Sequence, residues 1–234
     1  MTLCPELTQD QHRQLIATPT ATLASVLSKL GGTNAWIRGA TPLATQSGDR
    51  IAGPAYTLRF SPARVGLELP VNTRLAIEGM TKGCVAVADT GNVTHVGVVG
   101  DVLSLRMKYL GVAGLVTDGA VRDAQGISES GLAVWSAGAA SPLPTDGLVL
   151  VGIEEIVRCG GVTICPGDII VADLDGVIVV PRDLLATVLE RSETMEKFEQ
   201  WVMLEVKRGV PLPGLYPPDE AAKQRYEFWL NEQF

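Results

Sequence analysis

The stretch from Gly100 to Asp123 holds the residues of this chain best suited to chemistry. It reads GDVLSLRMKYLGVAGLVTDGAVRD and begins with a glycine that frees the backbone and with Asp101, a good N-cap. The spacing predicts a helix that starts here and ends at Gly111. Because the first N–H groups of a helix lack partners within it, those of residues 101–103 can hold a small carboxylate. We therefore predict a site for a small organic acid at this helix start.

Arg122 and Asp123 follow a short apolar strand predicted at Gly114–Thr117. The guanidinium of Arg122 offers a planar fork of donors that matches a carboxylate or a keto oxygen. The carboxylate of Asp123 is the ligand type that Mg²⁺ or Mn²⁺ prefers, with water in the remaining positions. The pair therefore indicates an α-keto acid bound beside a hard divalent cation. The alternative is a surface ion pair of Arg122 with Asp123, with Asp101 acting only as a helix cap.

The elements that must position these residues begin with an N-terminal helical region and continue as short strands. Residues 8–30 carry apolar side chains at helical spacing, with a break at Thr18-Pro19-Thr20 and a stop at Gly31-Gly32. Within residues 51–180, Gly, Pro and Asp separate short apolar runs that are typical of strands. We predict strands at Cys84–Ala88, Val96–Val99, Leu115–Thr117, Val149–Val151, Ile169–Ala172 and Val177–Val180. A tight turn joins the last two.

The C-terminal part of the chain predicts one long helix and a docking tail. The helix spans Pro181–Arg208, opens with a proline and closes at Gly209. Beside its apolar stripe lies a polar stretch with three acidic residues, Glu193, Glu196 and Glu199. The tail is rich in proline and then aromatic, which predicts an extended segment followed by a short helix at Asp219–Leu230. Its aromatic side chains should dock on the body or on a neighbouring molecule.

Length and composition predict one domain of mixed α and β structure. The chain has 234 residues, of which 46% are hydrophobic and 19% charged, so it can bury one large core. We predict a single domain over residues 1–234, made of an N-terminal helical segment (1–32), a core (33–180), a long C-terminal helix (181–209) and a docking tail (210–234). Periodicity alone supports no finer fold class.

Composition also argues against nucleic acid and membranes as partners. A net charge of −7 and a pI near 4.9 repel phosphate backbones, and no Lys/Arg cluster offsets this repulsion. No apolar run approaches the roughly 20 residues that span a bilayer, and no signal-like pattern opens the sequence, so we expect a cytoplasmic protein. The cysteines lack CxxC spacing, and we expect Cys84 and Cys165 to be buried thiols.

Several further motifs surround the Gly100–Asp123 stretch in a recognisable order. They are Gly83-Cys-Val-Ala-Val-Ala-Asp89 before it, and Gly160-Gly-Val162, Pro166-Gly-Asp168 and Ala172-Asp-Leu-Asp-Gly-Val-Ile-Val-Val-Pro181 after it. Over residues 20–209 the chain resembles the RraA-like family of class II aldolases. The resemblance implies an α+β fold, a β/β/α swivelling-type sandwich with flanking helices. It also implies a homo-oligomer, a trimer or a hexamer, with active sites at subunit interfaces.

The resemblance assigns roles to individual residues. The substrate-binding loop of the family falls on Gly100, Asp101, Val102 and Leu103, its pyruvate-binding arginine on Arg122 and its metal-binding aspartate on Asp123. The aldolases of the family also bring an acidic residue from the C-terminal helix of the neighbouring subunit. Here that residue matches Glu199, with Glu196 as the alternative.

The implied activity is cleavage of a 4-hydroxy-2-oxo acid of the 4-hydroxy-4-methyl-2-oxoglutarate type to pyruvate and a carbonyl product, with oxaloacetate decarboxylation as a side activity. The implied cofactor is a divalent cation, Mg²⁺ or Mn²⁺. Arg122 and the N–H groups near Val102 and Leu103 would neutralise the charge of the forming enolate, and Asp101 would orient a water for proton transfer. Asp123 would hold the cation directly or through water.

Two other functions remain open at this point. Some relatives are regulators that bind ribonuclease E, and these can lack the metal-binding aspartate, so Asp123 favours an enzyme. The same site could also act on a sugar-derived 2-keto-3-deoxy acid, because the pyruvyl end is shared. Selectivity would then depend on residues around the other end of the substrate, for which Trp36, Arg59, Arg64 and the aromatic tail are candidates.

Overall fold

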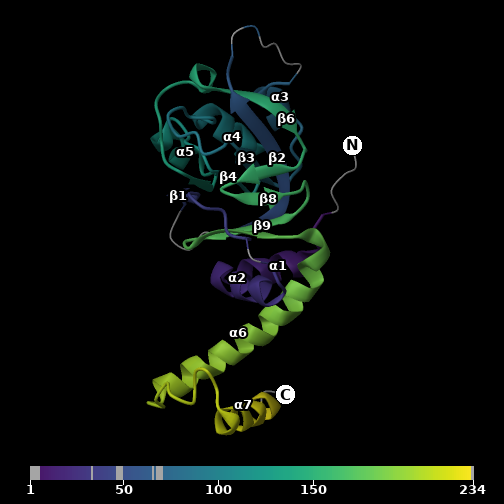
Figure 1. The fold of residues 1–234 in the computed structure, drawn as a ribbon, viewed down its shortest axis with the longest axis vertical. Coiled ribbons are helices and arrows are strands. Elements are labelled where there is room, and N and C mark those ends of the chain that lie inside the picture. Colours follow the sequence, from purple (N-terminus) through teal and green to yellow (C-terminus); the bar gives the residue numbers. More distant parts are fainter. Residues whose placement is uncertain (1–5, 33, 46–49, 65, 67–70, 233–234) are drawn as a thin grey trace.

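The computed structural model describes residues 6–32, 34–45, 50–64, 66 and 71–232, and shows a curled sheet with helices packed on it (Figure 1). Within this part of the chain, eight strands form the sheet in the order β1-β5-β4-β3-β2-β9-β10, with β6 paired to β2. Their bounds are β1 Thr41–Ala44, β2 Ile51–Pro62, β3 Val85–Asp89, β4 Gly114–Thr117, β5 Val134–Ser136, β6 Leu148–Ile153, β9 Ile169–Asp173 and β10 Gly176–Val180. A separate hairpin joins β7 (Val157–Cys159) and β8 (Val162–Ile164).

The long strand β2 holds the sheet together because three neighbours pair along it. Its first residues, Ile51–Pro54, run antiparallel to β9, and Ala55–Arg59 run parallel to β3. Its last residues, Leu58–Pro62, run antiparallel to β6. Strands β4 and β5 continue the parallel part beyond β3, whereas β10 lies antiparallel beyond β9. The sheet therefore consists of a parallel part and an antiparallel part, which β2 joins.

Helices cover both parts of the sheet. Helices α3, α4 and α5 pack on the parallel part, and α1, α2 and the first half of α6 pack on β9 and β10 (Figure 1). Their bounds are α1 Gln9–Ala17, α2 Thr20–Lys29, α3 Thr73–Glu78, α4 Asp101–Tyr109, α5 Ala124–Ser130, α6 Leu185–Lys207 and α7 Glu220–Glu232. The predicted break between α1 and α2 and the two predicted C-terminal helices are confirmed.

Strand residues alternate between two cores because successive side chains of a strand point to opposite faces. In β3, Val85 and Val87 face an inner core shared with β7–β10, whereas Ala86 and Ala88 face α3, α4 and α5. In β9, Ile170 faces the same inner core and its neighbours face α1, α2 and α6. Helices, parallel strands and antiparallel strands therefore form successive layers, which confirms the expected α+β class with flanking helices.

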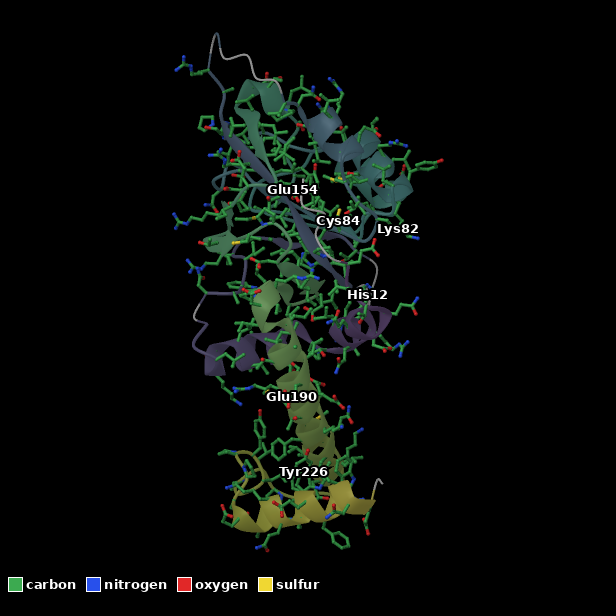
Figure 2. All side chains as sticks on the ribbon, turned by 90° about the vertical axis from the view of Figure 1, so that its right-hand side faces the viewer. His12, Lys82, Cys84, Glu154, Glu190 and Tyr226 are labelled. Atoms are coloured by element: carbon green, nitrogen blue, oxygen red, sulfur yellow. The ribbon has the colours of Figure 1, made fainter. Side chains whose placement is uncertain are left out.

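Helix α6 extends away from the sheet as an arm. It has 23 residues, so it is roughly 34 Å long. Figure 1 shows its second half running beyond α1 and α2, and Figure 2 shows Tyr226 at the far end, where α7 packs against it. The contact is aromatic: the rings of Phe198 and Tyr226 meet edge to face with centroids 5.2 Å apart, and Trp201 is buried beside them. The tail thus docks on the chain's own helix.

The structure corrects one predicted strand and adds a strand that was not predicted. The strand predicted at Val96–Val99 is wrong: this segment is a loop that leads to α4, in which Gly97 makes an isolated bridge to Ala120. Its valines are apolar because the loop is buried, with Val96 only 1% exposed. The patterns also did not predict β2, because Gly53-Pro54 interrupts its apolar run.

The cysteine expectations hold in part. Cys84 is a buried free thiol, and burial raises the pKa of that thiol to about 11. Cys165 is exposed, contrary to expectation, because it directly precedes the turn at Pro166-Gly167. Cys4 lies outside the described residues. Among the helices in the described ranges, none has the length and apolar composition needed to cross a membrane.

Asp173 ties the N-terminal helices to the sheet. It ends β9 at the predicted tight turn to β10 and is 6% exposed. Its carboxylate accepts hydrogen bonds from the Thr20 N–H at 2.9 Å and the Thr20 hydroxyl at 2.6 Å, at the start of α2. It also accepts one from the Asp175 N–H, and its backbone carbonyl accepts one from the indole of Trp135.

We expect Asp173→Ala to lower the free energy of unfolding by about 2–4 kcal/mol, because it leaves buried donors without an acceptor. Urea titration followed by circular dichroism measures the change. Asp175→Ala is the matched control: it lies in the same turn, is exposed and should leave the midpoint unchanged. Equal stability of the two variants would contradict the anchoring role.

Candidate active site

The candidate site lies where two loops meet beyond the carboxyl ends of β3 and β4. One loop leads from β3 to α4 and the other from β4 to α5, and parallel neighbours end at the same edge of a sheet. Backbone hydrogen bonds join the loops: the Val98 N–H donates to the Ala120 carbonyl at 3.0 Å, and the Arg122 N–H to the Val99 carbonyl at 2.9 Å. The start of α4 is thereby fixed beside Arg122 and Asp123.

These two loops line an open cavity of about 370 Å³. Six residues predicted for the site contribute to its lining, namely Gly100, Asp101, Val102, Leu103, Arg122 and Asp123. Five further lining residues were not predicted for the site, and they are Arg74, Gly97, Val98, Leu143 and Pro144. The structure thus brings the predicted helix start and the Arg-Asp pair into one cavity.

Glycines allow this close approach. A Cβ at Gly97 would lie 2.6 Å from the backbone nitrogen of Arg122, and a Cβ at Gly100 would lie 3.0 Å from a carboxylate oxygen of Asp123. A Cβ at Gly126 of α5 would lie 2.7 Å from the Cβ of Asp101. A larger residue at Gly97 or Gly126 would force the loops or helices apart, since side chains cannot pack this closely.

The start of α4 differs in detail from the prediction. Gly100, not Asp101, is the N-cap, and Asp101 is the first helical residue. The Asp101 carboxylate accepts a hydrogen bond from the neighbouring Val102 N–H at 2.7 Å. The cap is glycine because a side chain there would crowd Asp123. The N–H groups of Asp101 and Leu103 have no acceptor among the described residues, so they are donors that remain available at this helix start.

Arg122 and Asp123 form an ion pair inside the cavity. The Nε of Arg122 donates to Oδ2 of Asp123 at 3.0 Å, and the two side chains are 28% and 45% exposed. The Arg122–Asp123 ion pair that was considered as the alternative to a functional site is therefore present, but it lines a cavity together with the start of α4. Asp123 has a left-handed backbone, with φ 55°, which aspartate tolerates better than most residues. Such a conformation at a cavity is typical of functional sites.

The carboxylate oxygens of the cavity suit a hard cation that binds few protein ligands. Among the described residues, no group of three or more His, Cys, Asp or Glu side chains is placed to hold a metal. Asp123 offers a carboxylate, and Asp101 lines the same cavity. Mg²⁺ commonly binds through one or two carboxylates and keeps several waters, so the residues present fit Mg²⁺ or Mn²⁺.

Asp118, which is buried, and Asp89, which is half-buried, accept hydrogen bonds from the loops around the site. Asp118 is 1% exposed and accepts hydrogen bonds from the Thr90 N–H and hydroxyl and from the N–H groups of Asn92 and Gly160, at 2.8–3.2 Å. Burial raises the pKa of the Asp89 carboxyl, against the opposing effect of hydrogen bonds from backbone N–H groups. Asp118 thus connects three loops at this edge of the sheet.

The acidic residues of α6 lie elsewhere in the chain. The second half of α6, which carries Glu199, runs away from α4 and α5 (Figure 1). Glu196 accepts a hydrogen bond from the Thr22 hydroxyl at 2.5 Å, and Glu193 pairs with Lys197. Glu199 makes no hydrogen bond or ion pair with the described residues. A single chain therefore does not bring Glu199 to Asp123.

The candidates for selectivity also lie outside the cavity. Trp36 packs beside β10, and Arg59 pairs with Glu155. Arg64 is exposed and lines none of the cavity. Arg74 was missed because its sequence position four residues before Glu78 suggests an ordinary helical ion pair.

Comparison with known proteins establishes the family. The model of the RraA-like family, described as Aldolase/RraA, matches residues 20–179. The chain belongs to the RraA-like family. A 4-hydroxy-4-methyl-2-oxoglutarate aldolase, provisionally so named, from Halalkalibacterium halodurans is 32% identical over 178 residues, which cover 75% of this chain and 78% of that protein. Protein DlpA of Legionella pneumophila is 29% identical over 187 residues, 79% of this chain but only 29% of DlpA.

Solved structures agree on the fold. RraAS2 of Streptomyces coelicolor, described as an unusual member of the RNase ES inhibitor RraA protein family, superposes with a TM-score of 0.77 at 30% identity, over 84% of this chain and 97% of that one. An uncharacterized protein from Pseudomonas syringae pv. tomato gives a TM-score of 0.78 at 24% identity, over 89% and 98% of the two chains. The second similarity supports the fold alone.

Proposed function

We propose that this protein is a divalent-metal-dependent aldolase. It cleaves a 4-hydroxy-2-oxo acid of the 4-hydroxy-4-methyl-2-oxoglutarate type to pyruvate and a carbonyl product, and decarboxylates oxaloacetate as a side activity. The observation that carries the proposal is the single cavity lined by Arg122, Asp123 and the start of α4. The name of the Halalkalibacterium halodurans relative supports the same reaction.

The pyruvyl half of the substrate binds between the two loops. The two Nη atoms of Arg122, which make no hydrogen bond with the described residues, and the Leu103 N–H receive its carboxylate, because both are donors that line the same cavity. The Nε of Arg122 stays on Asp123, which orients the guanidinium. The substrate is thereby held with its keto oxygen near the Asp123 carboxylate.

Cleavage moves a proton from the 4-hydroxyl group and breaks the bond between C3 and C4. Asp123 would hold the divalent cation, which would supply electrophilic stabilisation of the keto oxygen as negative charge forms there. The Asp101 carboxylate takes up the hydroxyl proton, directly or through a water, and the electron pair of the broken bond becomes the enolate of pyruvate. Arg122 stabilises that charge, and protonation at C3 completes pyruvate. Loss of carbon dioxide from oxaloacetate gives the same enolate.

A protein-binding regulator is the second candidate function, and the similarity to RraAS2 favours it. Such a role needs no lined cavity with an arginine and two carboxylates. Pyruvate release separates the two candidates, because a regulator would release none.

The proposal includes a homo-oligomer, a trimer or a hexamer, in which Glu199 of a second copy completes the site. Glu199 has no partner among the described residues of its own chain, and it lies on an arm that leaves the body. Apolar side chains are exposed both on this arm and on α4 beside the cavity: Met203, Leu204, Val206, Leu212 and Phe228 on the former, Val102, Leu105 and Tyr109 on the latter. Contact between copies would cover both surfaces.

Removing divalent cations should abolish pyruvate release, and Mg²⁺ or Mn²⁺ should restore it, because the carboxylate-lined cavity holds hard cations. A coupled lactate dehydrogenase assay measures release from 4-hydroxy-4-methyl-2-oxoglutarate and oxaloacetate after exhaustive EDTA treatment. Undiminished turnover of the treated protein would refute the metal dependence.

Arg122→Ala and Asp123→Ala should each lower kcat/KM at least about a hundredfold, about 3 kcal/mol, because each removes a group that stabilises the enolate. Circular dichroism should show an intact fold. Glu129→Ala is the matched control, since it lies on α5, is exposed and bonds only Gln125 among the described residues. A variant of Arg122 or Asp123 that keeps more than about a tenth of the activity would show that the role is assigned wrongly.

Mixing inactive Asp123→Ala with inactive Glu199→Ala protein under subunit exchange should recover part of the activity, because some interfaces would pair an intact Asp123 with an intact Glu199. Mixing Asp123→Ala with Arg122→Ala is the control and should recover none, since both residues belong to the same loop. A fully active monomer in light scattering would refute the shared site. An oligomer without recovery would refute the choice of Glu199.

A further inference from the structure

A second cavity adjoins the candidate active site. Its volume is about 240 Å³, and it shares Arg74, Val98, Leu103 and Pro144 with the first cavity. The two cavities therefore form one cleft that continues beyond the pyruvyl position. Resting on the proposed function, we propose that this second cavity receives the distal end of the substrate and that Arg74 binds an anionic group there, a second carboxylate.

The walls of the second cavity are mainly apolar, and Asn72, Thr73 and Thr145 are their neutral polar residues. Phe60, Val71, Leu148 and Leu150 contribute side chains from β2, β6 and the approach to α3. Among its described lining residues, Arg74 carries the only charge. A small group with one anionic end and one short alkyl face matches these walls, because the guanidinium pairs with the anion and the hydrocarbon walls cover the alkyl face.

Arg74 can bind an anion because Arg106 pairs with Glu78, the carboxylate expected to pair with Arg74. Glu78 lies four residues further along α3, the spacing of a helical ion pair. Instead, Glu78 accepts two hydrogen bonds from Arg106 of α4, at 2.9 Å from Nε and 2.7 Å from Nη2. Arg74 makes no hydrogen bond or ion pair with any described residue. Arg74 is the second residue of α3, whose start is capped by Asn72, and the Asn72 side chain accepts a hydrogen bond from the Leu75 N–H at 3.0 Å.

This arrangement distinguishes between two substrate classes that share a pyruvyl end. A sugar-derived 2-keto-3-deoxy acid presents several hydroxyl groups at its distal end, and apolar walls would leave part of them without hydrogen bonds, which is costly. A dicarboxylic 4-hydroxy-2-oxo acid presents one carboxylate and little else. The cleft therefore selects the dicarboxylic class.

The first test measures binding without turnover. Titration calorimetry in the presence of Mg²⁺ compares pyruvate, which fills the first cavity alone, with 2-oxoglutarate, which adds a distal carboxylate. Arg74→Met keeps the aliphatic length and removes the charge, and it should weaken 2-oxoglutarate about tenfold or more while pyruvate affinity changes less than about twofold. Arg74→Lys should restore part of the loss, and the 2-oxoglutarate affinity of the wild type should fall with added salt.

The second test measures kcat/KM with 4-hydroxy-4-methyl-2-oxoglutarate and with the neutral-ended 4-hydroxy-2-oxopentanoate. Arg74→Met should lower the first value about tenfold or more and leave the second within about twofold. Arg158→Met is the matched control, because Arg158 is exposed on β7 and lines neither cavity.

The outcomes separate this inference from the proposed function. Equal losses for both substrates, or no loss for either, would overturn the role of Arg74 while pyruvate release still supports the aldolase. Absence of pyruvate release from every substrate in the wild type would overturn the aldolase. In that case unchanged 2-oxoglutarate affinity in Arg74→Met would overturn the role of Arg74 as well, and weakened affinity would support it as an anion site of the cleft.

Discussion

The candidate site depends on the backbone contact between the loop after β3 and the loop after β4. Two hydrogen bonds make this contact, and Gly97 permits it because a Cβ there would lie 2.6 Å from the Arg122 nitrogen. The buried carboxylate of Asp118 holds both loops and the β7–β8 turn from beneath. A helix start and an Arg-Asp dipeptide are each common and weak features alone. They line one cavity because these bonds fix their distance.

Two ion pairs near the cleft determine which arginines have a carboxylate partner. Arg122 pairs with Asp123, and Arg106 donates two hydrogen bonds to Glu78, from Nε and from Nη2. These pairs are partly exposed, so they add little to stability. Their effect is on recognition: the first orients Arg122 toward a ligand, and the second leaves Arg74 without its helical partner. The Arg106–Glu78 pair between α3 and α4 thus leaves the charge of Arg74 without a carboxylate partner among the described residues.

The sequence predicted the features that are local in the chain and missed those that depend on distant contacts. The start of α4 and the Arg122-Asp123 pair were predicted because each lies within a few consecutive residues. The strand predicted at Val96–Val99 was wrong because burial makes a loop as apolar as a strand, and the identity of the N-cap depended on Asp123 across the cavity. The sequence could not predict that Arg74 lacks an ion-pair partner on its own helix. Glu78, the expected partner, binds Arg106 instead, and Arg106 lies on another helix.

The arm formed by α6 and α7 has a core of its own. Trp201, Leu215 and Ala222 are buried there with the rings of Phe198 and Tyr226, in a cluster separate from the one that packs the first half of α6 on the sheet. One continuous helix connects the two clusters, so the arm keeps its direction without resting on the body. A rigid arm that points away from its own cavity cannot return Glu199 to it. Within the proposed function, the acidic residue that completes each site must therefore come from another copy of the chain.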